Sequence, residues 1–184
     1  SVPYDGTDIE KVPSGGTKLS YKIQGNMIQT SLDCCFIKLH YLALQTDSDG
    51  YRLPTESEWE YCCRAGSMEK FSFGDNVTGT ANFTQSGDVF EPGTTPAGYY
   101  TNATNRFGLL DVHGNVWEWC YDYYGSYDGA DVTDPGGPSS GTDRVIRGGS
   151  WNSLPDDLRI CNRWIANPSF SNFNIGFRIA CKAD

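Results

Sequence analysis

The spacing of apolar positions changes along the chain and separates a helical first third from a loop-rich remainder. Residues 18–24 alternate polar and apolar side chains, which predicts one short strand. Over residues 31–45 the apolar side chains recur every three or four positions after a serine N-cap, which predicts a helix. A second helix is predicted over residues 55–66, because Thr55 and Glu58 have the spacing of a capping box.

The helical period is lost after residue 66. For about 80 residues, glycine, asparagine, aspartate and threonine separate short apolar groups, a pattern typical of long loops. Strand-like runs return at residues 116–120, 144–147 and 176–180. No repeat or linker interrupts the chain, so residues 1–184 are predicted to form one domain. The order of strand, two helices, long loops and late strands predicts an α+β fold.

Composition and charge exclude several classes of protein. Hydrophobic residues make up 38% of the chain and aromatic residues 14%, which excludes a disordered or collagen-like protein. No stretch approaches the roughly 18 consecutive apolar residues of a membrane-spanning helix, so no membrane insertion is expected. The net charge is −9 and no lysine lies between Lys70 and Lys182. Binding to nucleic acid, which needs cationic side chains, is therefore disfavoured.

The seven cysteines do not form a recognisable framework. Their number is odd, and the vicinal pairs Cys34-Cys35 and Cys62-Cys63 are poor candidates for internal disulfides. Their spacing also fits no zinc-binding template. We expect those on helical faces to act as small buried hydrophobic residues, and their redox state stays open.

Five segments carry a family resemblance: YRLPTESEWEYCCRAG (51–66), NRFGLLDVHGNVWEWC (105–120), DRVIRGGSWN (143–152), CNR (161–163) and NIGFRIA (174–180). Their order and spacing resemble the formylglycine-generating-enzyme, or sulfatase-modifying-factor, domain family. The resemblance covers roughly residues 50–181 and implies a loop-rich variant of the C-type lectin fold. It also implies a location at the cell surface or outside the cell.

Several residues of these motifs have expected structural roles. Three tryptophans are expected in the core: Trp117, Trp119 and Trp151. Arg147 and Arg178 lie in apolar strands, so we expect them to meet carboxylates or carbonyls. His113 is expected to be a hydrogen-bonded turn residue.

The family resemblance also bears on catalysis. The oxidases of this family carry two cysteines shortly after the GGS-aromatic motif, which bind copper(I) and react with the substrate cysteine. In this chain the corresponding positions hold Ser153 and, approximately, Leu158, which cannot form a thiolate copper site. Related iron enzymes need a histidine cluster, but this chain contains only His40 and His113. The sequence predicts a non-catalytic protein that requires no cofactor. A copper-dependent formylglycine-generating oxidase, or a related redox enzyme using Cys161 or a vicinal cysteine pair, remains the alternative.

Some members of the family are variable proteins of diversity-generating retroelements, which display diversified residues on a C-type lectin scaffold. The placement of RGGSWN, CNR and GFRIA around two variable stretches resembles theirs. This implies a recognition segment at residues 153–173 that binds an unidentified protein or other ligand. Its expected ligand-binding residues are Ser153, Leu154, Pro155, Asp156, Asp157, Leu158, Trp164, Ile165, Asn167, Phe170, Ser171 and Phe173. Aromatic residues among small polar ones are typical of a paratope, although ordinary loops that pack inward are the alternative.

A structural calcium ion is a further implication of the resemblance. Family enzymes bind calcium through an asparagine and the next carbonyl, together with an aspartate and a carbonyl two residues later. Asn82, Phe83, Asp88 and Phe90 match that arrangement, and residues 115–118 match a second site more loosely. Oxygen ligands of this kind suit calcium, while Asx turns are the alternative explanation.

Overall fold

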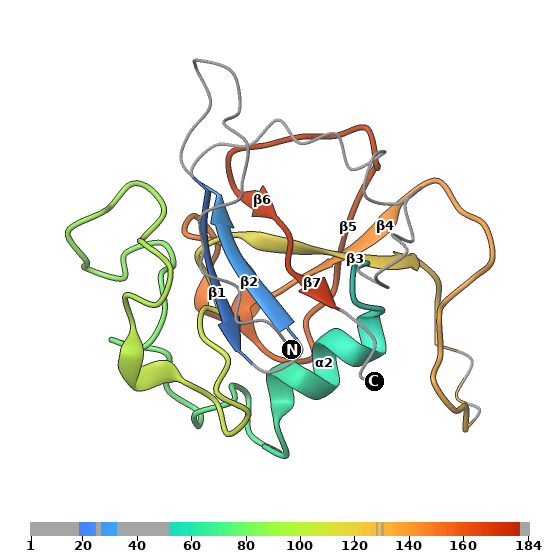
Figure 1. The fold of residues 1–184 in the computed structure, drawn as a ribbon, viewed down its shortest axis with the longest axis horizontal. Coiled ribbons are helices and arrows are strands. Elements are labelled where there is room, and N and C mark those ends of the chain that lie inside the picture. The colour runs from blue at the N-terminus through green and yellow to red at the C-terminus, as the bar shows by residue number, and fades with distance from the viewer. Residues whose placement is uncertain (1–18, 25–26, 33–51, 128, 130, 181–184) are drawn as a thin grey trace, which may run out of the picture.

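Two small sheets make up most of the regular structure (Figure 1). The computed structural model describes residues 19–24, 27–32, 52–127, 129 and 131–180. In the first sheet, β2 (Met27–Leu32) lies between β1 (Leu19–Gln24) and β7 (Ile179–Ala180), and both pairings are antiparallel. The strand predicted at residues 18–24 is confirmed by β1.

The first predicted helix is wrong at its start. Ser31 and Leu32, expected to begin it, are the last residues of β2 and pair with Ser20 and Leu19 of β1. Pairing with a neighbouring strand supplies the backbone hydrogen bonds that a helical turn would otherwise make, so the local helical pattern is overridden. The rest of that predicted helix, residues 33–45, lies outside the described residues.

The second sheet has the order β5-β4-β3-β6. Its strands are β3 (Trp117–Tyr123), β4 (Arg144–Arg147), β5 (Trp164–Ala166) and β6 (Ile175–Gly176). β4 runs antiparallel to β3 and β5, whereas β6 runs parallel to β3. The strand predicted over residues 176–180 is instead divided between β6 and β7, which belong to different sheets. The side chains of Phe177 and Arg178, between these two strands, are buried where the chain crosses from one sheet to the other.

The predicted capping box begins α2 (Glu56–Arg64). The amide of Glu58 donates to the hydroxyl of Thr55 over 3.2 Å, and the amide of Thr55 donates to the carboxylate of Glu58 over 2.8 Å. The helix ends at Ala65, which adopts a left-handed conformation with a φ of 46°. Its buried face places Trp59 in the core between the helix and the second sheet.

The tryptophan predictions are confirmed at two of three positions. Trp117 and Trp119 of β3 are buried together with Ile146 of β4. Trp151 is only partly buried, and its ring lies 5.7 Å from that of Phe173 at the surface. Trp151 follows the buried turn of residues 148–150, which carries the chain out of the core.

Two arginines in the interior have carboxylate partners, as expected. Arg178 forms a bidentate ion pair with Glu118 at 2.5 Å, and the indole N–H of Trp59 donates to the same carboxylate over 2.6 Å. Arg147 is fully buried and lies between Glu56 and Glu60 of α2. The pairs of Arg147 join α2 to β4, and the indole of Trp59 joins α2 to β3. Each carboxylate satisfies an arginine that would otherwise be buried and unpaired.

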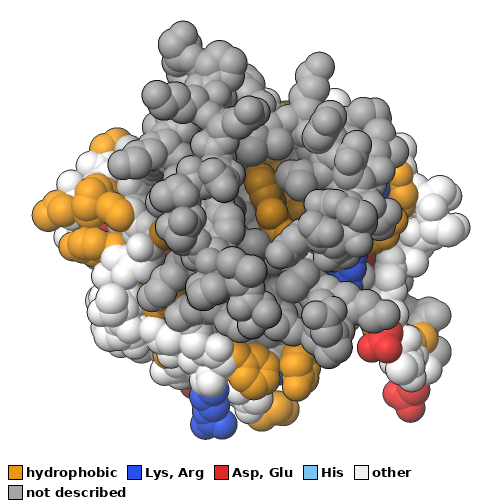
Figure 2. Space-filling model, viewed as in Figure 1, with side chains coloured by type: hydrophobic (Ala, Val, Ile, Leu, Met, Phe, Trp, Pro, Cys, Tyr) orange, Lys and Arg blue, Asp and Glu red, His pale blue; other side chains and the backbone are white. Residues whose placement is uncertain are grey.

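Long loops surround this framework. Among the described residues they contain only two short 3-10 helices, η1 (Thr101–Ala103) and η2 (Pro155–Leu158). The loop between β3 and β4 projects from the molecule, and Figure 2 shows carboxylate side chains in that region. In the described part of the chain, no helix combines the length and apolar character needed to cross a membrane.

Candidate ligand-binding face

The recognition segment divides into an exposed set and a buried pair. The exposed residues are Leu154, Pro155, Asp156, Trp164, Ile165, Asn167, Phe170, Ser171 and Phe173, while Asp157 is half-buried. Five of them are large and apolar, with exposed fractions of 64% at Leu154, 58% at Trp164, 55% at Phe173, 49% at Phe170 and 42% at Ile165. These five exposed apolar side chains lie within 20 positions of one another in the sequence and are candidates for contact with a partner.

The expected display of Leu158 is wrong. Its side chain is fully buried in a cluster with Phe71, Val77 and Phe83. Gly149 makes room for it, because a Cβ at that position would lie 2.6 Å from Cδ1 of Leu158. The single turn of η2 leaves its first residues in solvent and directs its last one inward.

Ser153 is also buried, which contradicts its expected display. Its hydroxyl accepts a hydrogen bond from the amide of Ser150 over 3.1 Å and lies 3.0 Å from the Ser150 hydroxyl. Its carbonyl accepts from the amide of Thr84. Ser153 therefore fixes the turn that precedes the exposed residues.

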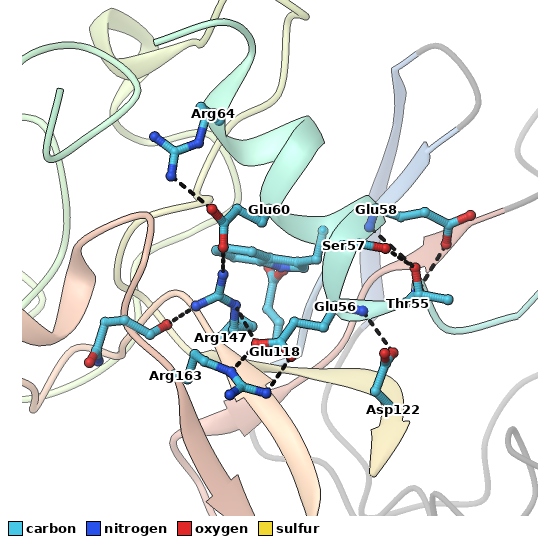
Figure 3. A network of polar contacts seen from close by, with 12 residues as sticks. Thr55, Glu56, Ser57, Glu58, Glu60, Arg64, Glu118, Asp122, Arg147 and Arg163 are labelled. Atoms are coloured by element: carbon cyan, nitrogen blue, oxygen red, sulfur yellow. Dashed lines mark hydrogen bonds and ion pairs between the residues drawn. The ribbon is translucent and has the colours of Figure 1, made fainter. Parts of the chain in front are cut away.

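Charged and polar contacts hold both ends of β5. Arg163 immediately precedes the strand and forms a bidentate ion pair with Glu56 of α2, at 2.6 and 2.7 Å (Figure 3). Its guanidinium also lies over the rings of Tyr124 and Tyr127, 4.7 and 4.1 Å from their centroids. Beyond the strand, the side-chain amide of Asn167 donates to the carbonyl of Thr142 over 3.3 Å. The exposed side chains of β5 are thus presented by an anchored backbone.

Two cavities lined by described residues adjoin the segment, and the sequence did not predict them. The larger, of about 920 Å³, lies between α2, Arg163 and the loop that follows β3. The smaller, of about 460 Å³, is lined by residues that include Leu154, Asp156 and Phe83. The tyrosine-rich run at residues 121–127 was the sequence signal for the larger cavity, since Tyr123 and Tyr127 line it.

Residues 17–183 match the sulfatase-modifying factor enzyme 1-like domain. The chain belongs to this family. The expected C-type-lectin-like fold is confirmed by the solved structure of Treponema denticola variable protein 1, which superposes with a TM-score of 0.69 at 32% sequence identity. That superposition covers 76% of this chain and 50% of the variable protein.

Curated relatives in the family have several names. The formylglycine-generating enzyme of Streptomyces coelicolor is 36% identical over 150 residues, which are 73% of this chain and 48% of the enzyme. The serine/threonine-protein kinase pkn1 of Chlamydia caviae is 42% identical over 138 residues, which are 71% of this chain and 21% of the kinase. The chain therefore spans half or less of the length of these relatives.

The described thiols of this sulfatase-modifying-factor domain differ in exposure. Cys63 and Cys120 are buried, Cys62 is partly buried and Cys161 is exposed. Burial raises the pKa of the Cys63 and Cys120 thiols, so both stay protonated at neutral pH. Among the described residues, no three histidine, cysteine, aspartate or glutamate side chains are grouped as a metal site.

His113 lies beside one of these thiols and is fully engaged. One ring nitrogen is 2.7 Å from the carbonyl of Leu158, and the other accepts from the amide of Ser72 over 3.0 Å. Burial lowers the pKa of His113 to about 4, with a smaller contribution from the positive charge of Arg178. The ring is therefore neutral at pH 7, which agrees with its expected structural role.

The residues expected to bind calcium partly fit a hard cation. The side-chain oxygen of Asn82 is buried with no hydrogen-bond partner among the described residues, while the side-chain nitrogen donates to the carbonyl of Gly93. The carboxylate of Asp88 accepts hydrogen bonds from Ser86 and Tyr100, at 2.7 and 2.8 Å. Partial burial raises the pKa of Asp88, but these bonds and that from the Phe90 amide outweigh it, and the net pKa is lowered. A buried oxygen without a partner and an ionised carboxylate are donors of the kind that calcium prefers, and calcium would be held by Asn82 and Asp88 with the carbonyls of Phe83 and Phe90.

Proposed function

We propose that this domain is a non-catalytic binding module, a variable protein of a diversity-generating retroelement, that recognises a protein or other ligand through residues 154–173. The observation that carries the proposal is the set of large apolar side chains left in water, Leu154, Trp164, Ile165, Phe170 and Phe173. Such side chains give contact area at low conformational cost when the backbone beneath them is fixed. At β5 the backbone is held in place by the ion pair of Arg163 and by the side-chain hydrogen bond of Asn167.

Likeness to Treponema denticola variable protein 1 supports the same assignment. By the family resemblance, the proposed setting is the cell surface or the extracellular space. Neither nucleic acid nor membrane insertion is part of the proposal.

The chemistry at the two positions where family oxidases carry copper-binding cysteines supports a non-catalytic role. Ser153 offers a hydroxyl that is already bonded to Ser150, and Leu158 offers a hydrocarbon side chain inside the core. Copper(I) prefers soft sulfur ligands, which neither group can provide. The exposed Cys161 is the thiol that could still support the redox alternative.

A conversion assay separates these functions. The purified protein is incubated with copper(I), oxygen and a peptide that contains the CxPxR motif, beside a Cys161→Ser variant. We expect no tight copper binding and an unchanged mass at the peptide cysteine for both proteins. Copper-dependent formation of formylglycine would refute the proposal, and its loss in the Cys161→Ser variant would identify the thiol responsible.

A further inference from the structure

The two exposed apolar residues of β5 point to opposite faces of the sheet. Trp164 is opposite Ile146 of β4, and Ile165 is opposite Val145. Ile146 belongs to the core cluster around Trp119, whereas Val145 belongs to the cluster around Trp59. Because successive side chains of a strand alternate between faces, Trp164 and Ile165 cannot both contact a partner that covers one face.

The position of β5 makes a different mode of contact possible. It is an edge strand of the second sheet, and among the described strands it pairs with β4 alone. No backbone hydrogen bond joins residues 164–166 to any other described segment. An edge strand presents unpaired N–H and C=O groups that a further strand can use. A strand added beside β5 would also carry side chains on both faces, and could therefore cover both Trp164 and Ile165.

We propose that β5 receives an extended, positively charged segment of a partner protein as an additional strand of the second sheet. The proposal rests on the proposed binding function and specifies how the partner binds. Strand addition takes affinity from main-chain hydrogen bonds and specificity from alternate side chains. Because β5 has only three residues, its main-chain bonds are few and contacts with Trp164 and Ile165 must contribute much of the affinity.

The fixed backbone of β5 favours this mode. The ion pair of Arg163 with Glu56 holds one end of the strand, and the bond between Asn167 and Thr142 holds the other. A strand that is already extended loses little conformational entropy when a partner pairs with it.

The charge around β5 selects the partner. The loop of residues 124–143, between β3 and β4, contains four aspartates and no lysine or arginine. Asp131 and Asp134 in this loop are exposed, and carboxylates project from this part of the molecule in Figure 2. The loop reaches β5 through the contact of Asn167 with Thr142, and lines the larger cavity together with Arg163. Of the two arginines next to β5, Arg163 is already paired with Glu56, and Arg144 lies over the rings of Tyr121 and Tyr123. With a net charge of −9 on the chain, lysine or arginine side chains on the added segment are therefore favoured over acidic ones.

The same charge disfavours a second copy of this chain as the added strand. Pairing β5 with its own copy would bring two aspartate-rich loops and two chains of net charge −9 together. Like charges across an interface cost free energy and suppress that pairing. We expect a monomer by analytical ultracentrifugation at physiological salt, and a dimer that is lost in an Ile165→Lys variant would overturn the assignment of a basic partner.

Synthetic peptides test the binding mode directly. The probe is a nine-residue peptide in which lysine alternates with valine, and two further versions carry N-methyl groups on alternate amides along one edge or the other. An added strand uses only one of its edges to hydrogen-bond with β5. The peptide methylated on that edge should bind at least tenfold more weakly than the parent peptide, and the peptide methylated on the other edge should bind with an affinity within about twofold of the parent. Hydrogen exchange at residues 164–166 should slow only with the peptides that bind. No binding, or equal binding of the two methylated versions, would overturn strand addition.

Protein variants test the side chains and the charge. Trp164→Ala and Ile165→Ala should each weaken binding of the lysine-containing peptide about fivefold or more, because the added strand contacts side chains on both faces of the sheet. Met68→Ala is the control, since Met68 is an exposed apolar residue that follows α2, outside the recognition segment, and it should change affinity less than twofold. A dependence on only one of the two β5 side chains would indicate docking on one face and overturn the proposal.

Replacing Asp131 and Asp134 with asparagine should weaken binding of the lysine peptide severalfold. Replacing the peptide lysines with glutamate should have the same effect, and equal affinity for the lysine and glutamate peptides would overturn the assignment of a basic partner. The proposed function fails by different results, namely formylglycine formation or a large loss of folding stability on truncation of exposed aromatics.

Discussion

Truncating two exposed aromatics of the recognition segment should leave the fold largely intact. The perturbation is the double variant Trp164→Ala/Phe170→Ala, in which one side chain comes from β5 and the other from the loop that follows it. If the proposed binding function is right, these rings contribute to recognition more than to folding. The matched comparison is Trp119→Ala, which removes an aromatic ring from the core of the same sheet.

The expected free energies of unfolding follow from exposure. Trp164 and Phe170 leave 58% and 49% of their surface in water, so each retains at most about half of the ~3 kcal/mol that full burial of a large apolar side chain provides. Substitutions at exposed positions usually change the free energy of unfolding by no more than about 0.5 kcal/mol each. We therefore expect the double variant to lose about 1–2 kcal/mol. Trp119 is only 2% exposed, and replacing a buried tryptophan by alanine costs about 3–5 kcal/mol.

Denaturant unfolding of the wild type and the two variants, followed by far-ultraviolet circular dichroism, measures these losses. Trp151→Ala belongs in the same series, because its partial burial against Phe173 predicts an intermediate loss rather than the full loss of a core residue. If the Trp164/Phe170 variant loses as much stability as Trp119→Ala, its rings are part of the core and display is refuted.

Two further outcomes concern a titrating side chain and a bound ion. The pKa of His113 is lowered to about 4 from 6.5, so between these pH values the unfolded state binds more protons than the native state. The free energy of unfolding should therefore fall by about 1.4 kcal/mol per pH unit as the pH drops through this window. Urea titrations at several pH values measure it, and a His113→Asn variant with the same pH dependence would contradict this. If Asn82 and Asp88 hold calcium, excess EDTA should lower the melting temperature of the wild type but not of an Asn82→Ala variant, since an ion bound only by the native state stabilises it. An unchanged melting curve, together with no calcium by elemental analysis, would remove the site.

Local signals in the sequence determined the elements that depend on nearby residues. The capping box of Thr55 and Glu58 begins α2 because both partners lie within one helical turn. The alternating run at residues 18–24 was enough to predict β1, and the apolar run at 144–147 was enough to predict β4. The order of the five motifs was enough to identify the family. Exposure of most of the recognition segment also followed from its irregular mixture of apolar and small polar residues.

Only the tertiary structure decided which neighbours distant segments would meet. Leu158 resembles its exposed neighbours in sequence, yet it is buried because Phe71 and Phe83 arrive from loops far away in the chain. Ser31 lies in a helical pattern but pairs with Ser20 in a sheet.

The edge position of β5 and the opposite faces of its two apolar residues likewise depend on which strand lies beside it. A sequence pattern records the preference of each segment in isolation. Burial, pairing and unpaired edges instead depend on free energies of contact between segments that are far apart in the chain.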